Sequence, residues 1–324
     1  MIAAARSVAT AAALLIGIAG AAAQTYPARP ITIVVPAAPG GVTDMLGRLL
    51  AKRLTQDFGQ QTIVENKPGA NNQIAAEYIA KSAPDGYTLF VGPETTFVVN
   101  PSIYSKLAYD PIKDFTPISG LITINHALIV HPSLPVANVK ELIALAKQRP
   151  GELNYGTFGI GSSGHLNMEL LQSAADIKLV PVHYKGATPA LTDVIAGHIQ
   201  LMFISVGSAV PQWKAGKVRM LAVGARKRLE GLPEIPTVSE SGLPGFEAVS
   251  WFALYGPAGL PPTIVTKLNA EVRALFADPE VHRTFMAPQY FESIVDSPAE
   301  LTGYLDAEAK KWGKVIRDAN IKVE

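Results

Sequence analysis

Two glycine-rich loops are the strongest candidates for chemistry in this sequence, because each follows a predicted strand and opens a predicted helix. The first loop spans residues 36–44 and contains Gly40 and Gly41. Glycines let backbone N–H groups approach a ligand closely, and the N-terminus of the following helix adds the positive end of its dipole. The loop is therefore suited to binding an anion such as a carboxylate, although a tight turn alone would also use two glycines.

The second loop spans residues 155–165, and its core, Gly159-Ile160-Gly161-Ser162-Ser163-Gly164, matches the dinucleotide-binding pattern G-x-G-x-x-G. A Rossmann fold places an Asp or Glu at the end of the next strand to bind the ribose. Here that strand ends in His183-Tyr184-Lys185-Gly186, which disfavours a dinucleotide. The adjacent serine hydroxyls favour a carboxylate cradle. A nicotinamide-dependent oxidoreductase that uses the Gly159 loop remains the alternative.

Other reactive arrangements are absent from the sequence. Ser163 does not lie in the G-x-S-x-G elbow of hydrolases, because the fifth residue of that window is His165. The six histidines form no H-E-x-x-H pattern, and the chain has no cysteine. We therefore expect a protein that is not an enzyme and needs no metal or cofactor.

Composition and charge limit the classes of partner that the protein can bind. The 324 residues are 48% hydrophobic and 17% charged, with a formal net charge of +1. Residues 1–23 combine Arg6, an apolar stretch and Ala21-Ala22-Ala23, as a secretory signal peptide does. Cleavage after about Ala23 removes one of 28 Lys and Arg residues, leaving 27 against 27 Asp and Glu, so the mature chain is formally neutral. We expect an exported protein that does not bind nucleic acid.

The elements that must position the loops alternate along the chain as in a mostly parallel α/β sheet. Thr43 and Thr188 are expected to cap helices, and only helices are expected after Pro261. Two similar apolar segments, 127–135 and 253–261, suggest two crossings between lobes. We therefore expect one lobe from residues 24–124 and 248–324 and a second from 125–247. The predicted strands are 31–35, 61–65, 87–91, 153–157, 178–183, 199–205 and 218–223, and the predicted helices are 43–58, 73–81, 139–148, 163–175, 188–196, 263–277 and one that begins at Ser297.

From residue 26 onward the chain resembles the Bug or TctC family, the periplasmic substrate-binding proteins of tripartite tricarboxylate transporters. The segments that carry the resemblance are Val35-Pro36-Ala37-Ala38-Pro39-Gly40-Gly41-Val42-Thr43-Asp44, Glu65-Asn66-Lys67-Pro68-Gly69-Ala70, Asn100-Pro101-Ser102-Ile103-Tyr104, Asp110-Pro111-Ile112-Lys113-Asp114-Phe115, Val182-His183-Tyr184-Lys185-Gly186 and Ile235-Pro236-Thr237-Val238-Ser239-Glu240. The resemblance implies a two-lobed, type II periplasmic-binding-protein-like fold with a ligand cleft between the lobes. It also implies a small organic carboxylate as ligand, membrane permease subunits as partners, and a periplasmic location.

In the family, a carboxylate is held between the first glycine loop of one lobe and the serine-rich loop of the other, which here are residues 37–43 and 157–163. The family usually has Met-Phe-Asp where this chain has Met202-Phe203-Ile204, so we expect a ligand with an apolar or aromatic body in preference to an amino acid. We expect a monomer, and a ligand sensor for a signalling partner is a further alternative. The candidate ligand-contacting residues are Ala37, Ala38, Gly40, Gly41, Thr43, Asp44, Thr95, Thr157, Phe158, Gly161, Ser162, Ser163, Tyr184, Lys185 and Ile204.

Overall fold

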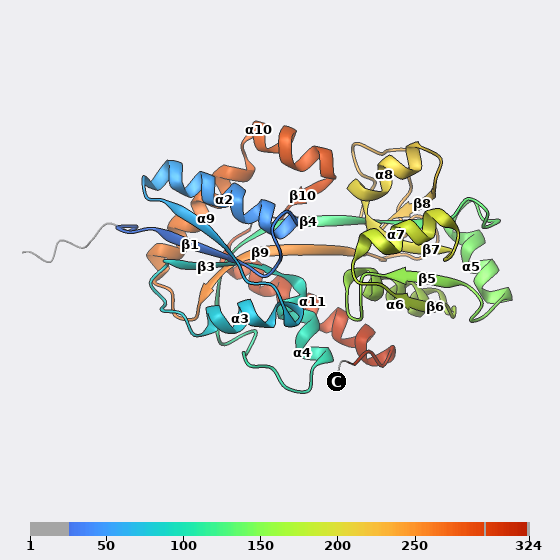
Figure 1. The fold of residues 1–324 in the computed structure, drawn as a ribbon, viewed down its shortest axis with the longest axis horizontal. Coiled ribbons are helices and arrows are strands. Elements are labelled where there is room, and N and C mark those ends of the chain that lie inside the picture. Colours follow the sequence, from blue (N-terminus) through green and yellow to red (C-terminus); the bar gives the residue numbers. More distant parts are fainter. Residues whose placement is uncertain (1–25, 295, 323–324) are drawn as a thin grey trace, which may run out of the picture.

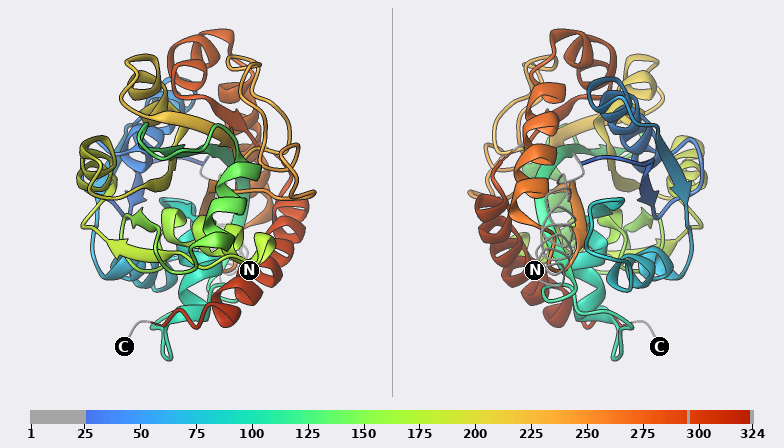
Figure 2. Two further views of the ribbon diagram at one scale, coloured as in Figure 1. Left: turned by 90° about the vertical axis from the view of Figure 1, so that its right-hand side faces the viewer. Right: turned by 90° about the vertical axis from the view of Figure 1, so that its left-hand side faces the viewer.

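The computed structural model describes residues 26–294 and 296–322, so the predicted signal peptide lies outside the described residues. Two α/β halves lie side by side and are joined by long central strands (Figure 1). Seen from either end, helices surround the strands (Figure 2). The strands are β1 (Ile31–Val35), β2 (Thr62–Asn66), β3 (Thr88–Pro93), β4 (Phe115–Val130), β5 (Asn154–Thr157), β6 (Val180–His183), β7 (Leu201–Ser205), β8 (Arg219–Val223), β9 (Val249–Pro257) and β10 (Phe291–Ser293).

The main helices agree with the periodicity of the sequence, and the residues that precede several of them explain where they begin. Asn138 and Ser162 accept hydrogen bonds at the starts of α5 and α6, and Ser297 with Glu300 forms the expected capping box of α11. Within the described residues, no helix is long and apolar enough to cross a bilayer. The helices are α2 (Val42–Phe58), α3 (Gln73–Ala80), α4 (Asn100–Ile103), α5 (Val139–Gln148), α6 (Ser163–Ala175), α7 (Ala187–Ala196), α8 (Val206–Lys214), α9 (Pro262–Phe276), α10 (Pro279–Val281) and α11 (Pro298–Asp318).

The strands form one continuous path in the order β2-β1-β3-β9-β4-β7-β5-β6, with β8 and β10 also pairing with β4. The outer pairs β1–β2, β1–β3, β5–β6 and β5–β7 are parallel, as expected of βα units. The central pairs are antiparallel, because β9 runs opposite to β3 and β4, and β4 runs opposite to β7. The prediction of a mostly parallel sheet is therefore wrong at the centre.

Strand β4 passes from one half of the molecule to the other and changes its partners as it does so. Up to Asn125 it pairs with β9, and from His126 onward it pairs with β7. The chain returns beside this point, where the Gly224 N–H donates to the His126 carbonyl and the Ala248 N–H donates to the Gly224 carbonyl. Two strands of backbone therefore connect the halves at the same place.

The buried side chains also divide at this place. Two apolar clusters are built from buried residues before 125 and from 251 onward, with Leu166 as the exception. The buried residues of the other two clusters all lie between 127 and 248. Leu166 belongs to α6, which packs against the C-terminal helix α11. Burial of each large apolar side chain contributes about 1.5–3 kcal/mol, so each half has a core large enough to hold its shape.

Several local predictions are wrong for physical reasons. Helix α2 is capped by Gly41, two residues before the expected cap, so Thr43 is inside the first turn. Helix α7 is likewise capped by Gly186 in place of Thr188. Strand β10 follows Pro261, where only helices were expected, because a three-residue strand can form only on the edge supplied by β4.

Candidate functional site

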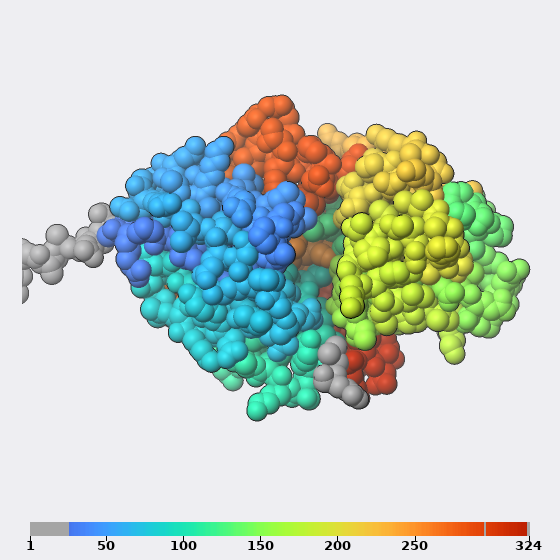
Figure 3. Space-filling view, viewed as in Figure 1, coloured from blue at the N-terminus to red at the C-terminus, as the bar shows by residue number. Residues whose placement is uncertain are grey.

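A cavity of about 240 Å³ lies where the two halves meet. Its walls come from both halves, with Val42 and Thr95 on one side and Phe158 and Ser163 on the other. The space-filling view shows the hollow between the two halves (Figure 3). The cavity thus lies between the two loops that the sequence singles out.

Four helices begin at this cavity. Val42, Ser163 and Ala187 are the first residues of α2, α6 and α7, and Ser205 caps α8. Ser162 caps α6 with its side chain, whereas α2, α7 and α8 have no side-chain cap, which leaves their first N–H groups for other partners. Each helix N-terminus stabilises an anion by about 0.3–1 kcal/mol. The residues that line the cavity include no Lys or Arg, so helix dipoles and backbone donors are its source of positive potential.

The first loop is held in shape by Asp44, whose carboxylate is almost fully buried. It accepts hydrogen bonds from the Gly40 N–H at 3.0 Å, from the Asn66 amide at 2.9 Å and from the Arg48 guanidinium at 2.8 Å. The Arg48 hydrogen bond is the main reason that the pKa of Asp44 is lowered to about 2. Asp44 was expected to contact the ligand, but the structure assigns its oxygens to the loop itself. Asp44 would therefore act on a ligand indirectly, by positioning the backbone of Gly41 and Val42.

Hydrogen bonds within the second loop hold its shape. The Phe158 N–H donates to Ser162 Oγ, the Gly159 N–H to Thr157 Oγ1 and the Gly161 N–H to His165 Nδ1. These three backbone donors are therefore used to hold the shape of the loop. Phe158 and Ser163 are the residues of this loop that line the cavity.

The remaining predicted residues divide into those at the cavity and those away from it. Thr95, Phe158, Ser163 and Ile204 line it. Tyr184 donates to Asp193 at 2.5 Å outside the cavity, and Lys185 is exposed. The predicted residues that the structure does not place in the cavity wall are Ala37, Ala38, Gly40, Gly41, Thr43, Asp44, Thr157, Gly161, Ser162, Tyr184 and Lys185.

Sequence reasoning missed most of the cavity wall between the two loops. Glu94, the residue that follows β3, and Ser250, in β9, both line the cavity. Neither residue belongs to a sequence motif. The strand order β3-β9-β4 brings them together, and the sequence does not reveal that order. The additional lining residues are Val42, Pro93, Glu94, Ile124, His126, Ala187, Ser205, Ser250, Trp251 and Phe252.

His126 lies in this wall at the point where β4 changes partners. It is 3% exposed, and burial lowers its pKa to about 4, so the ring is neutral at physiological pH. The ring is therefore a fixed part of the wall and carries no charge that could hold an anion.

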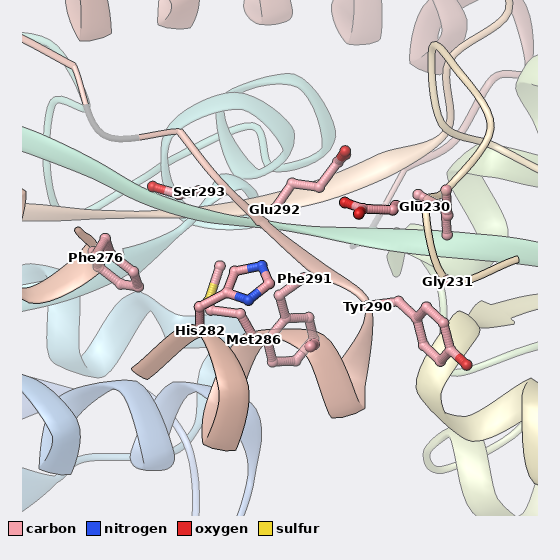
Figure 4. Close-up of a pocket in the computed structure, with 11 residues that line it drawn as sticks. Glu230, Gly231, Phe276, His282, Met286, Tyr290, Phe291, Glu292 and Ser293 are labelled. Carbon is pink, nitrogen blue, oxygen red and sulfur yellow. The ribbon is translucent and has the colours of Figure 1, made fainter. Parts of the chain in front are cut away.

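A second and larger cavity of about 610 Å³ lies away from both predicted loops. In Figure 4, Glu230 and Gly231 come from a loop of one half and face His282, Met286 and Phe291 of the other. None of the predicted site residues lines it. Nowhere in the described ranges do three or more His, Cys, Asp or Glu residues form a group that could hold a metal ion.

Comparison with known proteins places the chain in a family. Residues 46–321 match the family model described as "Tripartite tricarboxylate transporter family receptor" (TctC). The protein BugT of Bordetella pertussis (strain Tohama I) is 33% identical, over 93% of this chain and 93% of its own length. The structure of R. palustris Rpa4515 with adipate has a TM-score of 0.80 and 38% identity, covering 92% of this chain and 99% of that one.

MatC from Rhodopseudomonas palustris, solved with bound malate, has a TM-score of 0.75 and 32% identity, covering 90% of this chain and all of the other. The matched region includes most of both halves of the fold. It leaves out the first strand and the first glycine-rich loop, which precede residue 46. The resemblance seen in the sequence motifs is thereby confirmed, and so is the two-lobed α/β fold. The chain belongs to the TctC family of tripartite tricarboxylate transporter receptors, the periplasmic solute-binding proteins that include the Bug proteins.

Proposed function

We propose that this chain is exported to the periplasm, closes its two lobes over a small organic carboxylate, and delivers it to the permease subunits of a tripartite tricarboxylate-type transporter. The observation that carries the proposal is the set of four helix N-termini, from both halves, that begin at one interlobe cavity. The relatives solved with adipate and malate, which are both small carboxylates, support it.

The lobes of this proposal are residues 24–124 with 248–324, and residues 125–247. The change of partner between Asn125 and His126, and the division of the buried clusters, support these bounds. Closure would turn the halves about the two connections near residues 125 and 248. Cleavage after about Ala23 and action as a monomer belong to the same proposal.

Carboxylate capture without a basic side chain is energetically reasonable in this cavity. A carboxylate that leaves water must regain hydrogen bonds, and an uncompensated ion would cost several kcal/mol. The uncapped N–H groups of α2, α7 and α8 and the Ser163 hydroxyl can replace that hydration. The arrangement therefore binds the anion by dipoles, in keeping with the neutral charge expected of the mature chain.

A thermal-shift panel of mono-, di- and tricarboxylates on the mature protein tests this proposal. A ligand at 100 times its Kd stabilises the native state by about 2.7 kcal/mol, which raises the Tm by roughly 5–10 °C in a domain of about 150–250 residues. Stabilisation by at least one carboxylate, and none by its uncharged amide, is the expected result. Stabilisation by NAD or NADP with none by any carboxylate would contradict the proposal and favour the oxidoreductase alternative.

A further inference from the structure

The cavity holds two buried polar groups that the fold leaves without partners. Glu94 and Ser250 both line it and are 4% and 8% exposed. Glu94 Oε2 and Ser250 Oγ have no hydrogen-bond partner among the residues that the structure describes. A buried polar atom left unpaired costs about 1–3 kcal/mol, so two of them in one cavity indicate a place where a ligand supplies the missing hydrogen bonds.

The charges around Glu94 favour its neutral form. Burial raises the pKa of Glu94 to about 8, and the Glu308 carboxylate on α11 adds to the rise, while Lys311 opposes it. Tyr304, also on α11, has a pKa raised by burial and by Glu308 and Glu94. On the β4 side the cavity is lined by neutral His126. At neutral pH, Glu94 is accordingly an acid that can donate a hydrogen bond.

We propose that Glu94 and Ser250 form a second polar subsite of the same cavity, in which the protonated Glu94 carboxyl donates to a second oxygen acceptor of the ligand. This inference rests on the proposed function, in which the helix N-termini bind the first carboxylate. It defines the ligand as an acid with an oxygen acceptor, such as a second carboxylate, at the end opposite its first carboxylate. Ser250 would add a second donor to the same group.

The alternative occupant of an acidic subsite is an ammonium group, and the surroundings of Glu94 disfavour it. The same cavity is reached by the N-termini of α2, α6, α7 and α8, whose positive ends repel a cation. Much of the cavity wall is apolar and suits a carbon chain or ring. Its apolar members are Val42, Ile124, Phe158, Ile204, Trp251 and Phe252.

Calorimetric titration of the mature protein with matched acids tests the subsite. Each diacid from malonate to suberate is compared with the monoacid of the same carbon number, and adipate is also compared with 6-aminohexanoate. At about pH 6.5 we expect the best diacid to bind at least about tenfold more tightly than its monoacid, as one hydrogen bond with a charged partner allows. From pH 6.5 to about pH 9 its affinity should fall by about tenfold, because Glu94 then loses its proton while the ligand stays ionised.

Two variants separate hydrogen bonding from charge. Glu94→Gln keeps a neutral donor, so it should retain the diacid preference and remove the fall above pH 8. Glu94→Leu should bind the diacid and the monoacid with equal affinity. Glu230→Gln, at the larger cavity, is the matched control and should leave both measurements unchanged.

The outcomes also separate this inference from the proposed function. Equal binding of every diacid and monoacid pair, tighter binding of 6-aminohexanoate than of adipate, or loss of the diacid preference in Glu94→Gln would overturn the subsite alone. Failure of every acid to bind the wild type would overturn both proposals.

Discussion

The Asn167 side-chain amide donates a hydrogen bond of 3.0 Å to Nδ1 of His126, and both residues are almost completely buried. Because Nδ1 accepts, the ring carries its proton on Nε2, which faces the Ala248 carbonyl. This bond joins α6 to β4 where β4 passes between the lobes, and Ala248 lies on the returning connection. A neutral imidazole is thus part of the structure where the two halves are connected.

The first prediction concerns the stability of the protein in acid. The pKa of His126 falls from 6.5 to about 4 on folding, so below pH 6.5 the unfolded chain binds a proton that the folded chain does not. Stability should therefore decrease as the pH falls from 6.5 to 4, by about 3 kcal/mol for this histidine. Urea unfolding across this range measures it. His126→Gln should show a shallower loss than the wild type, and an equally steep loss would contradict the prediction.

A second prediction concerns the order of the first loop. Asp44→Asn removes the charge that binds Gly40, Arg48 and Asn66, so the free energy of unfolding should fall by about 1–3 kcal/mol near pH 7. The pKa of Asp44 is lowered from 3.8 to about 2, so its contribution is present above about pH 4 and is lost as the pH falls through 2. The difference between wild type and variant should shrink across that window. A constant difference would show that the charge does not order the loop, and Asp318→Asn on α11 is the control.

A substitution at Gly164 would alter the cavity indirectly, through the ring of Phe158. A Cβ there would lie 2.9 Å from the Phe158 ring, which lines the cavity. Gly164→Ala should therefore push this ring and weaken carboxylate binding by about tenfold, although alanine favours the helix by roughly 0.5–1 kcal/mol. Gly303→Ala, in α11 with no atom within 4 Å of the new Cβ, should stabilise without changing affinity. Equal affinities in both variants would show that Phe158 does not shape the site.

Substitutions at Ile204 test whether the ligand has an apolar body, as the sequence predicts. It is 1% exposed and lines the cavity, where the family usually has an acid. Ile204→Asp should lower the affinity for an apolar monocarboxylate by more than about tenfold, because a buried charge would face the ligand body. Ile204→Val, which removes one methyl group, should cost only about 0.5–1.5 kcal/mol of stability and keep the preference. Tighter binding of aspartate than of apolar acids to the wild type would contradict this expectation.

The parts of the site that the sequence predicted are local. Phe158 and Ser163 lie in the second glycine-rich loop at a strand-to-helix turn, and such turns are visible in consecutive residues. The fold class was likewise evident from the alternation of strands and helices. The caps were less predictable, because Gly41 and Gly186 adopt the cap positions that Thr43 and Thr188 would favour by residue type.

The parts that the sequence could not predict depend on pairing between distant strands. Phe252 pairs with Pro93 across 159 residues, and this register alone brings Glu94 and Ser250 to one cavity. Strand β10 likewise could not be predicted from its own three residues, because it forms by pairing with the edge of β4. Period-two patterns identify a strand but do not say which strand lies beside it.

Isothermal titration of the tightest-binding carboxylate to the wild type and to Gly41→Leu and Ser163→Leu tests the central claim most directly. Gly41 has a φ of −80°, and only the Ala38 oxygen, at 3.9 Å, lies near a new Cβ, so the fold accepts a side chain there. The account predicts that each variant unfolds near the wild-type temperature and binds at least about 100-fold more weakly, a loss of about 2.7 kcal/mol. Wild-type affinity in both variants would contradict the claim that the carboxylate lies between the two helix N-termini.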